Sequence, residues 1–181
     1  MNTLHLLVGL AGIAMPALAQ PPVAQRLLRT STSFNLAVHA PYARAAPLFG
    51  PEGERLWAVK HWNPEVLYPQ PAVDEEGMVF TIQHGPVKAV WVNTLFDVDA
   101  RHFQYVYVIP EIMATVIDVS FKIISPEQTG VYVVYTRTAL TPEGNEHVNT
   151  MTEGDKTAGK EWEEAIAQYL SHEKAAAHPG Q

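Results

Sequence analysis

Asp155 is one of two residues whose position in the sequence suggests acid–base chemistry. It follows Val148 by seven residues and Met151 by four, so it shares the apolar stripe of a predicted C-terminal helix. An acid on a buried helix face needs a partner or a chemical role. Arg137, in the last predicted strand, is one possible partner. Alternatively, the helix breaks at Gly154, and Asp155 caps the segment that follows.

Asp118 is the second candidate acid. It lies in "MATVIDVSFKII", residues 113–124, where strand alternation places it beside Ser120 and Lys122 on a polar face. If that face meets solvent, Asp118 is simply exposed. If the strand has the opposite phase, its carboxyl points inward with a raised pKa and could act as a general acid or base.

Aromatic residues on one strand face are candidate ligand contacts. In "RHFQYVYVIP", residues 101–110, Phe103, Tyr105 and Tyr107 alternate with polar and smaller residues. On a cavity wall they would combine apolar surface with hydroxyl groups that anchor a ligand. The alternative is an aromatic sheet face packed in the core.

Two tryptophans stand in an unusually charged and proline-broken stretch, "GERLWAVKHWNPEVLYP", residues 53–69. Trp57 and Trp62 each have an apolar body and a single N–H donor, which suits the half-hydrated edge of a pocket. Alternatively, both rings pack beneath the irregular crossing as a small secondary core.

The sequence lacks the usual signatures of metal, nucleotide and hydrolase sites. Cysteine is absent, which removes disulfides, thiolate ligands and a cysteine nucleophile. No pair of histidines has metal-ligand spacing, and there is no G-x-S-x-G, G-x-G-x-x-G or P-loop motif. We therefore expect no metal and no cofactor. The histidines His61, His84, His102 and His147 are scattered along the chain and do not form such a pair.

Composition predicts one globular domain that does not bind nucleic acid. The chain has 181 residues, of which 47% are apolar and 17% charged, as in ordinary globules. Its formal net charge is −7 without a basic run. That charge disfavours nucleic acid and anionic membrane surfaces.

The N-terminus resembles a secretory signal peptide. An apolar run over residues 6–14 is too short to span a bilayer. It is followed by Pro16 and the cleavage pattern Ala17-Leu18-Ala19. We predict a signal over residues 1–19 that is cleaved before Gln20, a periplasmic or secreted location, and no stable membrane insertion of the mature chain. Because the signal has no Lys or Arg, an uncleaved anchor or a misassigned start codon is the alternative.

The rest of the chain has the pattern of an antiparallel sheet and a long helix. A strand is predicted over 31–41 and short helices over 42–58, broken at Pro47 and Gly50-Pro51. Links of two to six residues predict hairpins between the later strands. A helix begins near Thr141 and is weakened by glycines in its middle. The later strands are predicted at 77–85, 88–98, 101–110, 113–124 and 130–140.

This order predicts an α+β fold in which a curved sheet of about six or seven strands wraps a long C-terminal helix. One helix cannot fill such a sheet, so a hollow is expected. The predicted divisions are a lead-in over 20–30, a domain over 31–172 and a flexible tail over 173–181.

Three segments of the chain resemble the SRPBCC superfamily of START-like, helix-grip proteins, which includes polyketide cyclase/dehydratase-like branches. They are "FGPEGERLWAVKHWNPEVLYP", "VWVNTLFDVDARHFQYVYVIP" and "EHVNTMTEGDKTAGKEWEEAIAQYL". The resemblance runs from about Ser31 to His172 and implies the helix-grip fold. It carries over no catalytic residue, because no signature is shared by all branches of the superfamily.

The resemblance implies a cavity between the concave sheet face and the C-terminal helix, with the short helices at its mouth. The first hypothesis is an exported protein that holds or carries an apolar ligand, such as a lipid or aromatic metabolite. The second is a cyclase/dehydratase-like lyase or isomerase that uses Asp155 or Asp118. The third is an envelope interaction module with a collapsed cavity. The expected ligand contacts are Trp57, Trp62, Phe103, Tyr105, Tyr107, Arg137 and Trp162.

Overall fold

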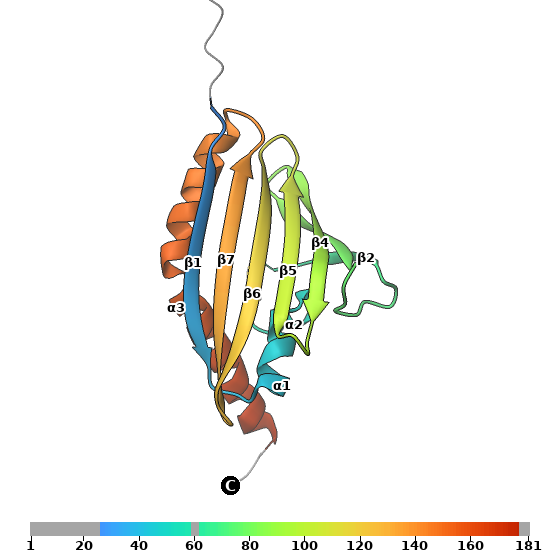
Figure 1. Ribbon diagram of the computed structural model, residues 1–181. Helices are drawn as coiled ribbons and strands as arrows, with labels where there is room; N and C mark the ends of the chain where they lie inside the picture. Colours follow the sequence, from blue (N-terminus) through green and yellow to red (C-terminus); the bar gives the residue numbers. More distant parts are fainter. Residues whose placement is uncertain (1–25, 59–61, 178–181) are drawn as a thin grey trace, which may run out of the picture.

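The described part of the chain forms one curved sheet with one long helix and three short helical segments (Figure 1). The computed structural model describes residues 26–58 and 62–177. The seven strands are all antiparallel, in the order β1-β7-β6-β5-β4-β3-β2. They are β1 (Arg29–Val38), β2 (Glu65–Tyr68), β3 (Val79–His84), β4 (Val87–Asp97), β5 (His102–Ile109), β6 (Met113–Ser125) and β7 (Gln128–Ala139). The helical segments are α1 (Tyr42–Ala45), η1 (Ala46–Phe49), α2 (Pro51–Glu54) and α3 (Gly144–Ala177).

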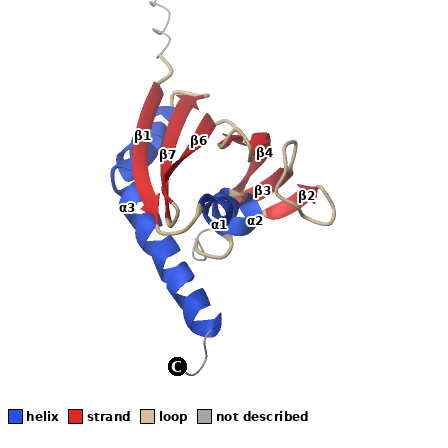
Figure 2. Cartoon of the chain, turned by 60° about the horizontal axis from the view of Figure 1, so that its bottom comes forward, coloured by secondary structure: helices blue, strands red, loops and turns tan. Residues whose placement is uncertain are grey.

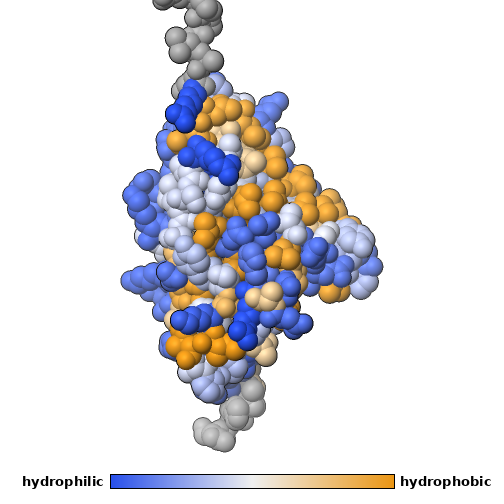
Figure 3. Space-filling model, viewed as in Figure 1, coloured by the Kyte–Doolittle hydropathy of each residue, from blue (hydrophilic) through white to orange (hydrophobic). Residues whose placement is uncertain are grey.

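Alternation along the central strands separates a buried concave face from a convex face. On β5, Phe103, Tyr105 and Tyr107 are buried, whereas the residues between them are partly exposed. β6 shows the same period, with Thr115 and Ile117 inside. In Figure 1 the convex face is toward the viewer and the helices lie behind it. Figure 3 shows apolar patches scattered among hydrophilic side chains on that convex face.

The predicted helix-grip fold is confirmed. The short helices break at Gly50, as predicted, whereas Pro47 lies in the first turn of η1 and the change from α1 to η1 falls between Ala45 and Ala46. The prediction missed β2, which is only four residues long and follows Pro64. β1 begins at Arg29, before the predicted domain start, and α3 continues to Ala177, past the predicted end at 172. The predicted signal over 1–19 and its cleavage site lie outside the described residues.

Helix α3 runs without a break through its two internal glycines. The Thr141 hydroxyl accepts a hydrogen bond from the Gly144 N–H at 3.1 Å, which satisfies one of the free donors at the helix start. Because the helix continues past Gly154, the alternative in which Asp155 caps a second segment is wrong. Within residues 26–58 and 62–177, no helix combines the length and apolar character needed to cross a membrane.

Helix α3 packs most closely along the edge strand β1 and makes fewer contacts with β7 and β6. The Glu163 carboxylate accepts the Ala37 N–H at 2.7 Å, so the helix also satisfies part of the open strand edge. At Gly159 the helix lies close to β1, since a Cβ there would lie 2.9 Å from the Asn35 carbonyl oxygen and 3.1 Å from the Phe34 ring. The helix therefore covers one side of the concave face and leaves the β3–β5 side to other segments.

The two glycines of α3 give a matched stability test. Gly154→Ala is expected to stabilise the protein by about 0.5–1 kcal/mol, because a methyl group there meets open space and alanine favours helix. Gly159→Ala is expected to destabilise it by about 1–2 kcal/mol, because crowding against β1 outweighs the helix propensity. Urea unfolding of both variants checks this, and equal stabilisation by both would contradict the close packing.

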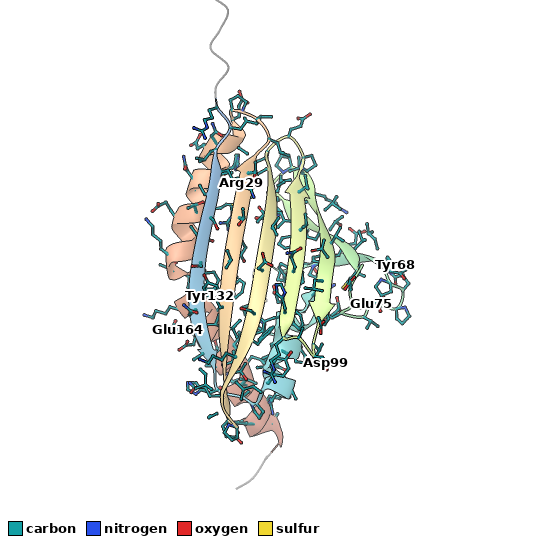
Figure 4. The ribbon with its side chains drawn as sticks, viewed as in Figure 1. Arg29, Tyr68, Glu75, Asp99, Tyr132 and Glu164 are labelled. Carbon is teal, nitrogen blue, oxygen red and sulfur yellow. The ribbon has the colours of Figure 1, made fainter. Side chains whose placement is uncertain are left out.

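The short helical segments lie in the concavity at one end of the sheet (Figure 2). Asp74, from the loop between β2 and β3, accepts the N–H of Glu52 at 2.9 Å and of Gly53 at 3.3 Å. This carboxylate thereby holds the start of α2 against the body of the protein. In Figure 4 the same loop, from Tyr68 to Glu75, projects from the side of the sheet.

Candidate functional site

A cavity of about 810 Å³ lies between the concave sheet face, the α2 segment and α3. This volume falls in the range of small-molecule pockets. The third hypothesis required a collapsed cavity, so the hollow gives that hypothesis no support. The lining is formed by Pro51, Glu54, Leu56, Trp57, Ala58, Trp62, Trp91, Tyr105, Ile117, Val119, Tyr135, Glu161, Trp162, Ala165, Gln168, Tyr169 and His172.

All four tryptophans of the chain line this cavity. Trp57 and Trp162 meet edge to face with centroids 5.4 Å apart, and Trp62 and Trp91 do the same at 5.4 Å. Each edge-to-face pair places the positive edge of one ring on the negative face of the other, which fixes both orientations. Two pairs of indoles thus give the cavity rigid aromatic walls.

Three of the lining aromatics also hold the short helical segment in place. Trp57 Nε1 donates to the Leu48 carbonyl at 2.7 Å, and Trp62 Nε1 donates to the Pro51 carbonyl at 2.7 Å. The Tyr105 hydroxyl donates to the Phe49 carbonyl at 2.6 Å. These bonds satisfy carbonyls that the short helices leave free. The polar atoms of Trp57, Trp62 and Tyr105 are therefore already committed to the fold.

Glu54 is a half-buried acid that lines the cavity. Loss of hydration raises its pKa well above the ordinary value of 4.5, and the nearby negative charge of Asp74 raises it further. No described residue forms a hydrogen bond or an ion pair with the Glu54 side chain. Perturbed carboxyls in cavities are candidates for binding or acid–base roles.

Glu54 should make the folded protein lose stability as the pH rises above 4.5. In that range the unfolded chain releases the Glu54 proton while the folded chain still holds it, so the unfolding free energy falls with pH. Glu54→Gln is expected to remove this fall and to be more stable than the parent at pH 7. Denaturation midpoints from pH 4 to 8 measure the effect. Glu161→Gln, at the exposed side of the cavity lining, is the control and should keep the parental pH dependence.

Two further polar groups of the lining have no partner among the described residues. The Trp91 indole N–H is buried and makes no hydrogen bond. The Tyr135 hydroxyl also makes none, and burial raises the pKa of this phenol well above 10.0. Tyr135 belongs to the inner face of β7, whereas the exposed Tyr132 lies on the outer face of that strand (Figure 4). The buried Trp91 and the half-buried Glu54 and Tyr135 thus have polar groups free to bind a ligand.

Asp155 is paired with Arg137, as the sequence suggested. Arg137 Nη2 donates to Asp155 Oδ1 at 2.9 Å and Nη1 contacts the other carboxylate oxygen, with both side chains at least 92% buried. The Thr32 hydroxyl donates to the same carboxylate, and the guanidinium carbon lies 4.4 Å from the centre of the Tyr135 ring. This pair joins α3 to β7 and β1. Neither residue is among those that line the cavity.

Asp118 lies on the convex face of the sheet and not in the cavity lining. Its Oδ1 lies 3.0 Å from His102 Nε2 and accepts a hydrogen bond from the Gln104 amide at 3.0 Å. The alternation therefore has the phase that places Asp118 with the exposed residues. The structure gives it a role in cross-strand pairing on β5 and β6.

Four of the predicted ligand contacts line the cavity: Trp57, Trp62, Tyr105 and Trp162. Phe103 and Tyr107 are fully buried behind the wall. Phe103 stacks on Phe96 at 4.0 Å, and Tyr107 stacks on Trp91 at 4.1 Å.

Glu54 and Trp91 were not singled out as ligand contacts from the sequence. The alternation in "VWV" marked Trp91 as a strand residue, but valines on both sides left its face undecided.

No group of three or more potential metal ligands converges anywhere in residues 26–58 and 62–177. The lining offers carboxyl, phenol, indole, amide and imidazole groups from α2, the sheet and α3. The arrangement can enclose an apolar molecule, contact it through hydrogen bonds, and exchange a proton with it at Glu54.

Comparison with known proteins finds similarity in structure only. No family model and no curated protein matches the sequence. Norcoclaurine synthase from Thalictrum flavum has a TM-score of 0.58 at 11% identity, over 87% of this chain and 98% of that chain. The same enzyme in complex with dopamine and hydroxybenzaldehyde gives 0.56 at 12% identity, over 86% and 91%.

Two other solved structures are similar to this chain. Ara h 8.0201 has a TM-score of 0.53 at 12% identity, over 77% of this chain and 99% of that chain. A protein from Thermobifida fusca has a TM-score of 0.58 at 15% identity, over 77% and 92%. At these identities the likenesses show the fold alone, and they agree with the predicted helix-grip architecture.

Proposed function

We propose that this helix-grip protein is exported and holds or carries an apolar small molecule in its cavity. The observation that carries the proposal is the cavity of about 810 Å³ walled by all four tryptophans of the chain. Rigid aromatic walls with few free polar groups are typical of sites for apolar ligands. Small molecules bound in the structurally similar norcoclaurine synthase support the same reading.

Titration with N-phenyl-1-naphthylamine, a neutral apolar fluorophore, tests the proposal. Binding in the cavity should enhance its emission with a stoichiometry of one and quench the emission of the lining tryptophans. A probe that binds with no change in tryptophan emission, or fails to bind, would contradict the proposed site.

Export rests on the A-x-A pattern that follows the apolar run at the N-terminus. Expression of the full chain in its source cells and sequencing of the mature N-terminus tests this part. We expect the mature chain to begin at Gln20. An N-terminus at Met1 in a cytoplasmic fraction would contradict export and leave the cavity proposal standing.

A cyclase/dehydratase-like activity is the second candidate, and Glu54 is the observation in its favour. Its raised pKa makes it a better proton acceptor than an ordinary carboxyl, and the Tyr135 phenol lines the same cavity. Asp155 is tied to Arg137 and Thr32 outside the lining, so the acid–base role moves to Glu54 in this candidate. Turnover that is lost in Glu54→Gln and kept in Asp118→Asn would favour the enzyme.

A further inference from the structure

We infer that the ligand is an apolar amine, whose cationic nitrogen binds at Glu54 while its apolar body lies between the tryptophans. This inference rests on the proposed function and narrows it to one chemical class. Three features of the lining support it: its charged side chains, the polar atoms that lack a hydrogen-bond partner within the described protein, and the negative faces of its aromatic rings.

The charged side chains of the described lining are acidic. Glu54 and Glu161 line the cavity, and the described lining contains neither lysine nor arginine. Arg137, a buried cation outside the lining, is held by the Asp155 carboxylate in a bidentate pair. A carboxylate ligand would therefore lie beside two acidic side chains and find no cationic partner in the described lining, which costs affinity.

The aromatic rings favour the same class of ligand. The faces of tryptophan and tyrosine rings are negative and attract ammonium groups, and clusters of such rings are the usual receptors for alkylated ammonium ions. Here four indoles and the Tyr105 and Tyr135 rings surround one cavity that also holds a carboxyl.

Glu54 has the free capacity that an ammonium group requires. The other deep polar atoms, Trp57 Nε1, Trp62 Nε1 and the Tyr105 hydroxyl, already donate to backbone carbonyls. The Glu54 carboxyl has no such partner among the described residues, and the Tyr135 oxygen has a free lone pair. An ammonium group would satisfy both acceptors.

Binding of a cation is linked to the proton on Glu54. Without a neighbouring cation, the Glu54 carboxyl has a raised pKa and keeps its proton to higher pH than an ordinary carboxyl. A cation beside it would lower that pKa and release the proton. A permanent cation should therefore bind more tightly as the pH rises until Glu54 is ionised. The titratable or charged groups around Glu54 are Glu52 and Arg55 on the same segment, Asp74 on the β2–β3 loop, Tyr105 and Tyr135 on the sheet, and Glu161, Tyr169 and His172 on α3.

Three ligands with one apolar body test the inference. They are 4-phenylbutylamine, 4-phenylbutanol and 4-phenylbutyrate, measured by displacement of N-phenyl-1-naphthylamine at pH 7.5. The amine is expected to bind at least ~10-fold more tightly than the alcohol, and the carboxylate more weakly than either. Glu54→Gln should lower amine affinity by ~10-fold or more and leave alcohol affinity within ~2-fold, because only the cation uses the charge. Glu164→Gln, which removes an equal charge on α3 outside the lining, is the matched control and should leave amine affinity within ~2-fold.

The pH dependence of a fixed cation gives a second readout. Affinity for 4-phenylbutyltrimethylammonium should rise with pH in the parent protein and stay flat in Glu54→Gln, while affinity for 4-phenylbutanol should not rise. Equal binding of amine and alcohol, or an amine affinity unchanged in Glu54→Gln, would overturn the amine assignment and leave the apolar cavity intact. If none of the three ligands binds and the fluorophore also fails, both the amine assignment and the proposed function fall.

Discussion

Asp155→Asn is expected to destabilise the protein by about 3–5 kcal/mol, because it leaves the Arg137 guanidinium buried without a counter-charge. Both side chains are almost fully buried, so water cannot replace the lost carboxylate. The Thr32 hydroxyl and the Tyr135 ring would keep only weak contacts with the altered site. Urea unfolding followed by circular dichroism measures the loss.

Two comparison variants separate this effect from general damage to α3. Glu164→Gln removes the exposed pair with Lys160, which are 3.7 Å apart, and should cost no more than about 0.5 kcal/mol. The double variant Arg137→Met/Asp155→Leu should recover much of the stability, because an apolar pair of similar size needs no counter-charge. A loss below about 1 kcal/mol in Asp155→Asn would show that the pair is hydrated.

Filling the cavity is expected to weaken ligand binding by ~100-fold or more, because bulky rings occupy the space that the ligand needs. The proposed variant is Ile117→Trp/Ala165→Trp, which adds an indole from β6 and another from α3 to the lining. Titration with the neutral fluorophore measures affinity, and circular dichroism verifies that the fold is kept.

The matched control places the same rings outside the cavity. Val116→Trp/Ala167→Trp changes the residue beside Ile117 on the convex face and an exposed residue near Ala165 on α3. This control should bind the probe within ~2-fold of the parent, since its added rings face away from the lining. Equal loss of binding in both double variants would mean that the ligand does not occupy this cavity.

The fold could be predicted because its long elements have clear periods. Alternation in β5 identified the buried face that carries Phe103, Tyr105 and Tyr107, and the three- and four-residue spacing identified α3. Strand β2 was missed because four residues among prolines are too few to show a period. Local propensity suggested a break at the glycines of α3, but Gly159 instead permits tight packing on β1.

The site was less predictable, because its polar groups are defined by contacts between distant segments. Asp155 and Arg137 were recognised as possible partners from their places on a helix and a strand. Glu54 lies in a charged helical stretch that resembles surface, and only the folding of Tyr105 and Tyr135 around the same space makes it a half-buried acid with a raised pKa. Because these residues are far apart in the sequence, no local pattern around Glu54 indicates that they share one cavity.

Native mass spectrometry of the mature protein, purified from its source cells and extracted with organic solvent, tests the central claim most directly. We predict one apolar molecule per chain, carrying a basic nitrogen, that is lost from Ile117→Trp/Ala165→Trp and retained by Val116→Trp/Ala167→Trp. A molecule that remains bound in the filled variant would place the site elsewhere. A mature chain that carries nothing, and also binds no neutral apolar probe, would contradict the account of the cavity as a binding site.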